Sequence, residues 1–60
     1  MTKIEAMNLA AQLNIVLPKT KCADVLLVKC IELGYLIGYE SPSADWIVFD
    51  MNNNEIARCA

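Results

Sequence analysis

The sequence predicts an α+β fold in which two helices precede a small three-stranded antiparallel β-meander. Apolar residues recur at helical spacing through residues 20–34. Beyond this segment the period changes to two, and a β-branched and aromatic run at residues 46–49 follows a turn-forming stretch. Sixty residues make one domain. We therefore expect a single unit, residues 1–60, with a helical part at 1–34 and a meander at 35–60.

The first helix is expected to begin at once. Thr2 and Glu5 have the spacing of a capping box, in which each side chain accepts the other residue's backbone N–H. Asn14 is suited to ending the helix in the left-handed conformation. The predicted inner face consists of Ala6, Leu9, Ala10 and Leu13. A second group widens the apolar arc, so this helix is expected to be contacted from two sides: Ile4, Met7 and Ala11.

The second helix is expected to follow a short extended connector. Pro18 disfavours the helical region for the residue before it, so residues 15–18 are predicted to be extended. Thr20 is the predicted N-cap, Asp24 lies where the helix dipole favours a negative charge, and Gly34 is the predicted left-handed C-cap. The predicted core stripe of this helix consists of Ala23, Leu26, Leu27, Cys30, Ile31 and Leu33.

Two valines interrupt the polar face of the second helix. On a helical wheel Val25 and Val28 lie among charged residues that include Lys29 and Glu32. One interpretation is that the C-terminal strands or a partner helix cover the two valines. The other interpretation is that they form an exposed apolar contact for another chain, and the two interpretations merge if the partner is a second copy.

Three strands are predicted after the helices. Period-two alternation marks residues 35–40, residues 46–49 form the second strand, and residues 55–59 return as the third. A turn at residues 52–54 leaves two registers open, because Ile56 faces Met51 after a two-residue turn and Asp50 after a three-residue turn. The last strand contains Arg58 but no proline, so its edge is predicted to be open to a strand of another chain.

The aromatic residues of the strands are candidate contact residues. Trp46 follows an aspartate at a strand start, and half-exposed Trp and Tyr side chains are favoured interface anchors. The residues predicted to contact protein are Val25, Val28, Tyr39, Trp46 and Arg58.

Catalytic and metal chemistry is not indicated. The chain contains no histidine, which is the commonest general base and a common zinc ligand. Cys22 and Cys30 lie about 12 Å apart along one helix, too far for a disulfide or a shared metal, so these two and Cys59 are predicted to be reduced thiols. We expect no enzymatic activity, no cofactor and no metal site.

The composition favours association with protein. The apolar fraction is 57%, which is more than so small a chain is expected to bury. The net charge of −2 disfavours a general nucleic-acid binder, which normally has a basic surface. No apolar run reaches the roughly 20 residues of a membrane span. A cytoplasmic homo-oligomer is therefore the expected form.

The helical half resembles a known family. The segments LAAQLNIVLP and KTKCADVLLVKCI are similar to SAP and related helix-extended-helix modules, over about half of the chain. The resemblance implies that Lys19, Thr20 and Lys21 approach a nucleic-acid backbone. The usual glycine of the turn is missing, and Cys22 and Asp24 stand among residues that are more basic in the family.

Two functions follow from these observations. The first is a non-enzymatic protein-binding module, a small regulator or inhibitor like those found among accessory proteins of phages and mobile elements. The alternative is a SAP-like nucleic-acid-binding module that uses the turn from Lys19 to Lys21.

Overall fold

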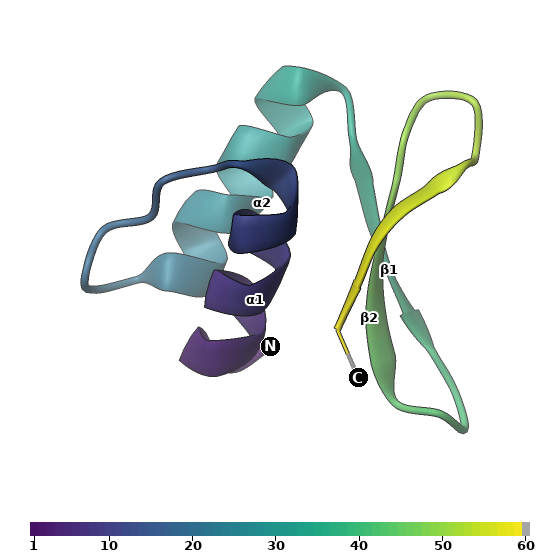
Figure 1. Cartoon of the computed structure of the whole chain (residues 1–60), viewed down its shortest axis with the longest axis horizontal. Coiled ribbons are helices and arrows are strands. Elements are labelled where there is room, and N and C mark those ends of the chain that lie inside the picture. Colours follow the sequence, from purple (N-terminus) through teal and green to yellow (C-terminus); the bar gives the residue numbers. More distant parts are fainter. Residues whose placement is uncertain (60) are drawn as a thin grey trace.

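The fold consists of two helices packed on one face of a three-stranded antiparallel sheet, which confirms the predicted ααβββ order. The computed structural model describes residues 1–59. Figure 1 shows the helical layer beside the sheet, whose strand order is β1-β2-β3. The elements are α1 (Lys3–Leu13), α2 (Cys22–Leu33), β1 (Leu36–Glu40), β2 (Asp45–Phe49) and β3 (Glu55–Cys59).

Helix α1 begins at the predicted capping box. The Glu5 backbone N–H donates to Thr2 Oγ1 at 3.1 Å, and the Thr2 backbone N–H donates to Glu5 Oε1 at 2.7 Å. Asn14 ends the helix in the left-handed conformation with φ 57°. The sequence alone is sufficient to predict both ends of this helix, because each cap depends on residues only three or four positions apart.

Helix α2 begins one residue later than predicted. Lys21, not Thr20, is the N-cap, and its left-handed backbone (φ 55°) leaves it without a side-chain cap hydrogen bond. The Cys22 thiol instead donates to the Pro18 carbonyl at 3.0 Å, which ties the connector to the first turn of the helix. Gly34 ends α2 with φ 79°, as predicted.

The core between the two layers is built mostly from small residues. Its buried members are Ala6, Leu9, Ala10, Cys22, Leu26, Cys30, Val48, Ala57 and Cys59. The predicted stripe of α2 was too wide, because Leu27, Ile31 and Leu33 are 43%, 74% and 54% exposed. Leu27 and Ile31 point about 100° and 140° away from Leu26 at about 100° per residue, outside the arc that α1 and the sheet can cover. Leu33 is the last residue of the helix.

The register of the β2–β3 hairpin differs from both predicted registers. Val48 faces Ala57 and Phe49 faces Glu55, so Ile56 is the extra residue of a bulge. Asp50 explains the length of the loop, since its carboxylate accepts the backbone N–H groups of Asn52 at 2.8 Å and Asn54 at 3.0 Å. Between the pairs Phe49–Glu55 and Trp46–Cys59, β3 therefore has one more residue than β2.

The second face of the sheet carries its own small apolar centre. Val48 lies in the core, so its neighbour Ile47 points away from the helices, yet it is only 4% exposed. Its cross-strand neighbours are Gly38 and Arg58. A Cβ at Gly38 would lie 3.4 Å from the Phe49 ring, so this glycine leaves room for the ring to lie close to β1.

Candidate protein-contact surfaces

The core consists mostly of small apolar residues, while many large apolar residues are exposed. Six of the nine core residues are alanine or cysteine. Large apolar residues exposed to solvent are Ile4, Met7, Val16, Leu27, Val28, Ile31, Leu33, Leu36, Tyr39, Met51 and Ile56. An exposed apolar surface of this kind marks sites of contact with other molecules.

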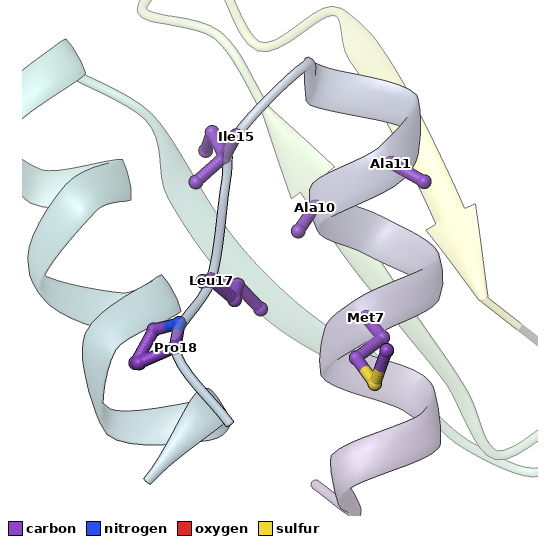
Figure 2. Close-up of a pocket in the computed structure, with 6 residues that line it drawn as sticks. All are labelled: Met7, Ala10, Ala11, Ile15, Leu17 and Pro18. Atoms are coloured by element: carbon purple, nitrogen blue, oxygen red, sulfur yellow. The ribbon is translucent and has the colours of Figure 1, made fainter. Parts of the chain in front are cut away.

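A first apolar groove lies between α1 and the connector. Its volume is about 150 Å³. Figure 2 shows the connector running alongside α1, with Ala10 and Leu17 projecting into the space between them. The groove is lined by Met7, Ala10, Ala11, Ile15, Leu17 and Pro18, and we call it the α1 groove.

The outer face of α1 extends this groove. Ile4 is 79% exposed and precedes Met7, which is 52% exposed, by one helical turn. Ala11 continues the same face into the groove. These are the residues that widen the apolar arc in the sequence, and at least half of the surface of Ile4 and of Met7 stays exposed among residues 1–59. Helix α1 is contacted from two sides, by α2 and by β3, as expected, yet this part of its apolar arc stays exposed.

A second apolar groove lies at the end of α2. Its volume is about 390 Å³, and its lining residues are Ile31, Gly34, Tyr35, Leu36 and Met51. A Cβ at Gly34 would lie 3.1 Å from Met51 Sδ. The glycine therefore adopts the left-handed cap conformation and also leaves room for Met51 of the β2–β3 loop to lie close. Leu36 and Met51 are 60% and 81% exposed.

Arg58 is held by three carboxylates on the face of the sheet that points away from the helices. Its guanidinium donates to Asp45 Oδ2 at 2.6 Å and to Glu40 Oε2 at 3.1 Å. Glu55 accepts two further hydrogen bonds, from Nη2 at 2.7 Å and from Nε at 3.2 Å. The bonds that Arg58 donates to Glu55 and Asp45 raise the pKa of Arg58, and those donated to Glu55 lower the pKa of that carboxylate.

This network gives Arg58 a structural role. Asp45 is only 8% exposed, and a buried carboxylate needs a charged or hydrogen-bonding partner. The guanidinium of Arg58 forms ion pairs within the chain with Asp45, Glu40 and Glu55. These bonds use four of the five N–H groups of the Arg58 guanidinium, so its side chain has little hydrogen-bonding capacity left for another protein.

The other predicted contact residues lie in two separate regions. Val25 is partly buried on α2, and Val28 is 54% exposed on the same helix. Tyr39 and Trp46 lie together on neighbouring strands, with ring centroids 4.9 Å apart in an edge-to-face arrangement. Trp46 also packs against the core, whereas Tyr39 is 57% exposed. The fold thus pairs the two aromatic residues and leaves the valines on another element.

The edge of β3 is covered by a side chain that the sequence did not single out. Gln12 of α1 accepts the Arg58 backbone N–H at 3.2 Å and donates to the Arg58 carbonyl at 2.8 Å. The amide imitates a neighbouring strand at this residue, and Asn8 Oδ1 orients it by accepting a hydrogen bond of 2.7 Å. The predicted opening of the β3 edge is therefore wrong at Arg58. The separation of 46 residues explains why no local pattern indicated the contact.

The turn of the SAP-like resemblance is exposed. Lys19, Thr20 and Lys21 all lie on the surface before α2. Neither lysine forms an ion pair with another of residues 1–59. Asp24 follows in the first helical turn and places a negative charge beside them. Nucleic-acid binding through this turn stays a prediction.

Other chemistry has little support in the part of the chain that the structure describes. No group of three or more Cys, Asp or Glu residues among positions 1–59 is arranged to hold a metal ion. The three cysteines are buried free thiols, and burial raises the pKa of Cys30. Neither helix of these residues is long and apolar enough to span a membrane.

Comparison with known proteins adds no relative to this description. No family model, no curated protein and no solved structure matches the chain.

Proposed function

We propose that the protein is a non-enzymatic protein-binding module, a small regulator or inhibitor that acts by contact with another protein. The observation that carries the proposal is the second apolar face of α1, which runs from Ile4 and Met7 into the α1 groove. A helix normally buries one apolar stripe against its own domain. Helix α1 buries Ala6, Leu9 and Ala10 in this way and still exposes a further apolar face.

The shape of the α1 groove suits an apolar side chain of a partner. A volume of about 150 Å³ is close to that of one large aliphatic or aromatic side chain. All six lining residues are apolar, so the groove favours an uncharged anchor. Interfaces of this kind are commonly organised around one buried anchor that is surrounded by weaker contacts.

The test compares two substitutions at equally exposed helix positions. Met7 in the α1 groove is 52% exposed and Val28 on α2 is 54% exposed, so Met7→Glu and Val28→Glu carry a similar cost to folding. The partner is captured from host cells, purified and titrated with each variant. We expect Met7→Glu to raise the dissociation constant about tenfold or more, because it places a charge in the apolar groove. Val28→Glu should bind the partner as tightly as the parent does.

The reverse result has a clear meaning. If Val28→Glu abolishes binding and Met7→Glu does not, the contact lies on the polar face of α2, where the sequence places its two valines. If both variants bind the partner as tightly as the parent does, neither surface forms the contact.

A further inference from the structure

The two edges of the sheet are protected unequally. At the edge of β3, Gln12 covers the backbone of Arg58, Ile56 forms a bulge, and Arg58 adds a charged side chain. These are the devices by which edge strands avoid pairing with other chains. Strand β1 is less protected: its ladder with β2 has no bulge, and its sequence, LIGYE, contains no proline, lysine or arginine and only one charged residue, Glu40 at its end.

The hydrogen-bond pattern identifies which groups of β1 face outward. The backbone N–H and C=O of Arg58 point away from β2 and toward Gln12. Arg58 and its cross-strand partner Ile47 therefore form a pair without hydrogen bonds, and the N–H and C=O of Ile47 point toward β1. Ile47 therefore bonds to Gly38, and by alternation the N–H and C=O groups of Ile37 and Tyr39 face away from the sheet. No backbone partner for these groups is found among residues 1–59.

We propose that β1 pairs antiparallel with β1 of a second copy of this chain, which joins two three-stranded sheets into one. Two identical antiparallel strands are related by a two-fold axis, and centring that axis on Gly38 places Ile37 opposite Tyr39 of the second copy, twice. Both residues have outward-facing backbone groups, so the two pairs form four hydrogen bonds. This surface is separate from the α1 groove, and the inference does not depend on the proposed function.

The side chains fit this register. Ile37 and Tyr39 form an aromatic and β-branched pair, which is a favourable combination across antiparallel strands. Tyr39 is already oriented by its contact with Trp46 and remains 57% exposed. A side chain held in place before binding loses less conformational entropy when the dimer forms.

The charges also fit a second copy. Glu40 is the one charged residue of β1, and it is paired with Arg58 at 3.1 Å. In the proposed register Glu40 lies opposite Leu36 of the second copy, and the two Glu40 residues are about 14 Å apart, at about 3.4 Å per residue along the strand. No pair of like charges is therefore brought together across the joined strands.

The apolar surface beside β1 extends the contact. Helix α2 packs against β1, and its exposed Ile31 borders the groove that contains Leu36 at the start of the strand. Leu27 lies one turn earlier on the same face of α2. A standard interface takes about 800 Å² from each partner, roughly a fifth of the 4102 Å² surface of this chain. Because the strand is short, we expect a dissociation constant of about micromolar order.

Cysteine cross-linking tests the register directly. In the proposed dimer the two Gly38 residues face each other as a pair without hydrogen bonds, with Cα atoms about 4.5 Å apart, a distance that a disulfide can span. A Cβ at Gly38 makes ordinary contact with Phe49 at 3.4 Å. We expect Gly38→Cys to form a covalent dimer under mild oxidation. Leu36→Cys is the matched control, because its two copies lie about 14 Å apart at the strand spacing used above.

The native thiols do not obscure this experiment. Cys22, Cys30 and Cys59 are 4%, 1% and 5% exposed, so the parent protein should stay uncross-linked under the same conditions. Cross-linking of Leu36→Cys as fast as that of Gly38→Cys would overturn the register and with it the proposal.

Solution mass tests the dimer without cross-linking. We expect the parent to show a concentration-dependent monomer–dimer equilibrium in sedimentation velocity, and Tyr39→Lys to shift it at least tenfold toward monomer, because lysine on an edge strand opposes pairing. Ile56→Lys introduces the same charge at the protected edge and should associate like the parent. A parent that is monomeric up to millimolar concentration overturns the proposal. Met7→Glu should leave the mass unchanged, which separates this result from the test of the α1 groove.

Discussion

At the scale of single residues, three carboxylates are stabilised in their charged form by local hydrogen bonds. The backbone N–H of Thr2 lowers the pKa of Glu5, and the backbone N–H of Asn54 lowers the pKa of Asp50. Hydrogen bonds from Arg58 lower the pKa of Glu55. These three groups hold a helix start, a loop and the outer face of the sheet, so their ionisation is coupled to folding.

These pKa shifts predict acid sensitivity. A carboxylate whose pKa is lower in the folded state adds stability above its unfolded pKa, and this stability is lost as the pH falls through the folded pKa. With ordinary values of 4.5 for glutamate and 3.8 for aspartate, the free energy of unfolding should be steady near neutral pH and fall below about pH 4.5. Urea denaturation at a series of pH values measures this fall.

A pair of glutamine substitutions isolates Glu55. We expect Glu55→Gln to be less stable than the parent at neutral pH and to lose less stability on acidification. Glu32→Gln removes the same charge from an exposed helix position whose partner, Lys29, lies 3.7 Å away. This control should keep the acid-induced fall, because the three hydrogen-bonded carboxylates are intact. Identical pH profiles for the two variants would contradict the role of Arg58 in holding Glu55.

At the scale of elements, α1 serves both the core and the edge of the sheet. One face of α1 places Leu9 at the centre of the core, and another face carries Gln12 to the backbone of β3. An amide is well suited to this position because it supplies one donor and one acceptor, as a neighbouring strand does. The contact fixes α1 along the edge of β3 and leaves β1 as the less protected edge.

Removing the amide should cost stability and open the edge of β3. We expect Gln12→Leu to lower the free energy of unfolding by about 1–2 kcal/mol, because two hydrogen bonds to Arg58 are lost at a solvent-exposed site. Urea denaturation measures the loss. Asn8→Leu is the matched control, since the Asn8 side chain is hydrogen-bonded to the Gln12 amide and its removal retains both bonds to Arg58. Equal losses of unfolding free energy in the two variants would show that Gln12 does not stabilise the fold through its hydrogen bonds to Arg58 of β3.

At the scale of the whole molecule, the small core limits stability. A chain of 60 residues buries a smaller fraction of its surface than larger domains do. The largest fully buried side chains are Leu9, Leu26, Val48 and Cys30, and the remainder of the core is small. Burial of the exposed apolar residues against another chain would therefore add a large share of the total stabilisation.

The three buried thiols report whether this core opens as one unit. Cys22 and Cys30 lie on α2 and Cys59 lies on β3, so alkylation of all three requires both layers to separate. We expect the three cysteines to be modified at similar rates that follow global unfolding, as measured by mass spectrometry of iodoacetamide-treated protein. Earlier modification of Cys22 would instead reveal local opening between the connector and α2.

The features that the sequence alone determined are those that depend on neighbours a few residues apart. The capping box of Thr2 and Glu5, the left-handed caps at Asn14 and Gly34, and the last strand are found where the sequence predicts them. Caps, turns and periodicity are local physics, so they can be read before the chain is folded. The order of the elements followed from these signals.

Tertiary structure decided how the elements are used. Which face of α2 is buried depends on the positions of α1 and the sheet, and this left Leu27 and Ile31 exposed. The bulge at Ile56 depends on how the Asp50 loop closes. The protection of β3 by Gln12 joins groups 46 residues apart, and the Arg58 network gathers carboxylates from all three strands. Such contacts have no local signature, because they exist only once the two layers have packed.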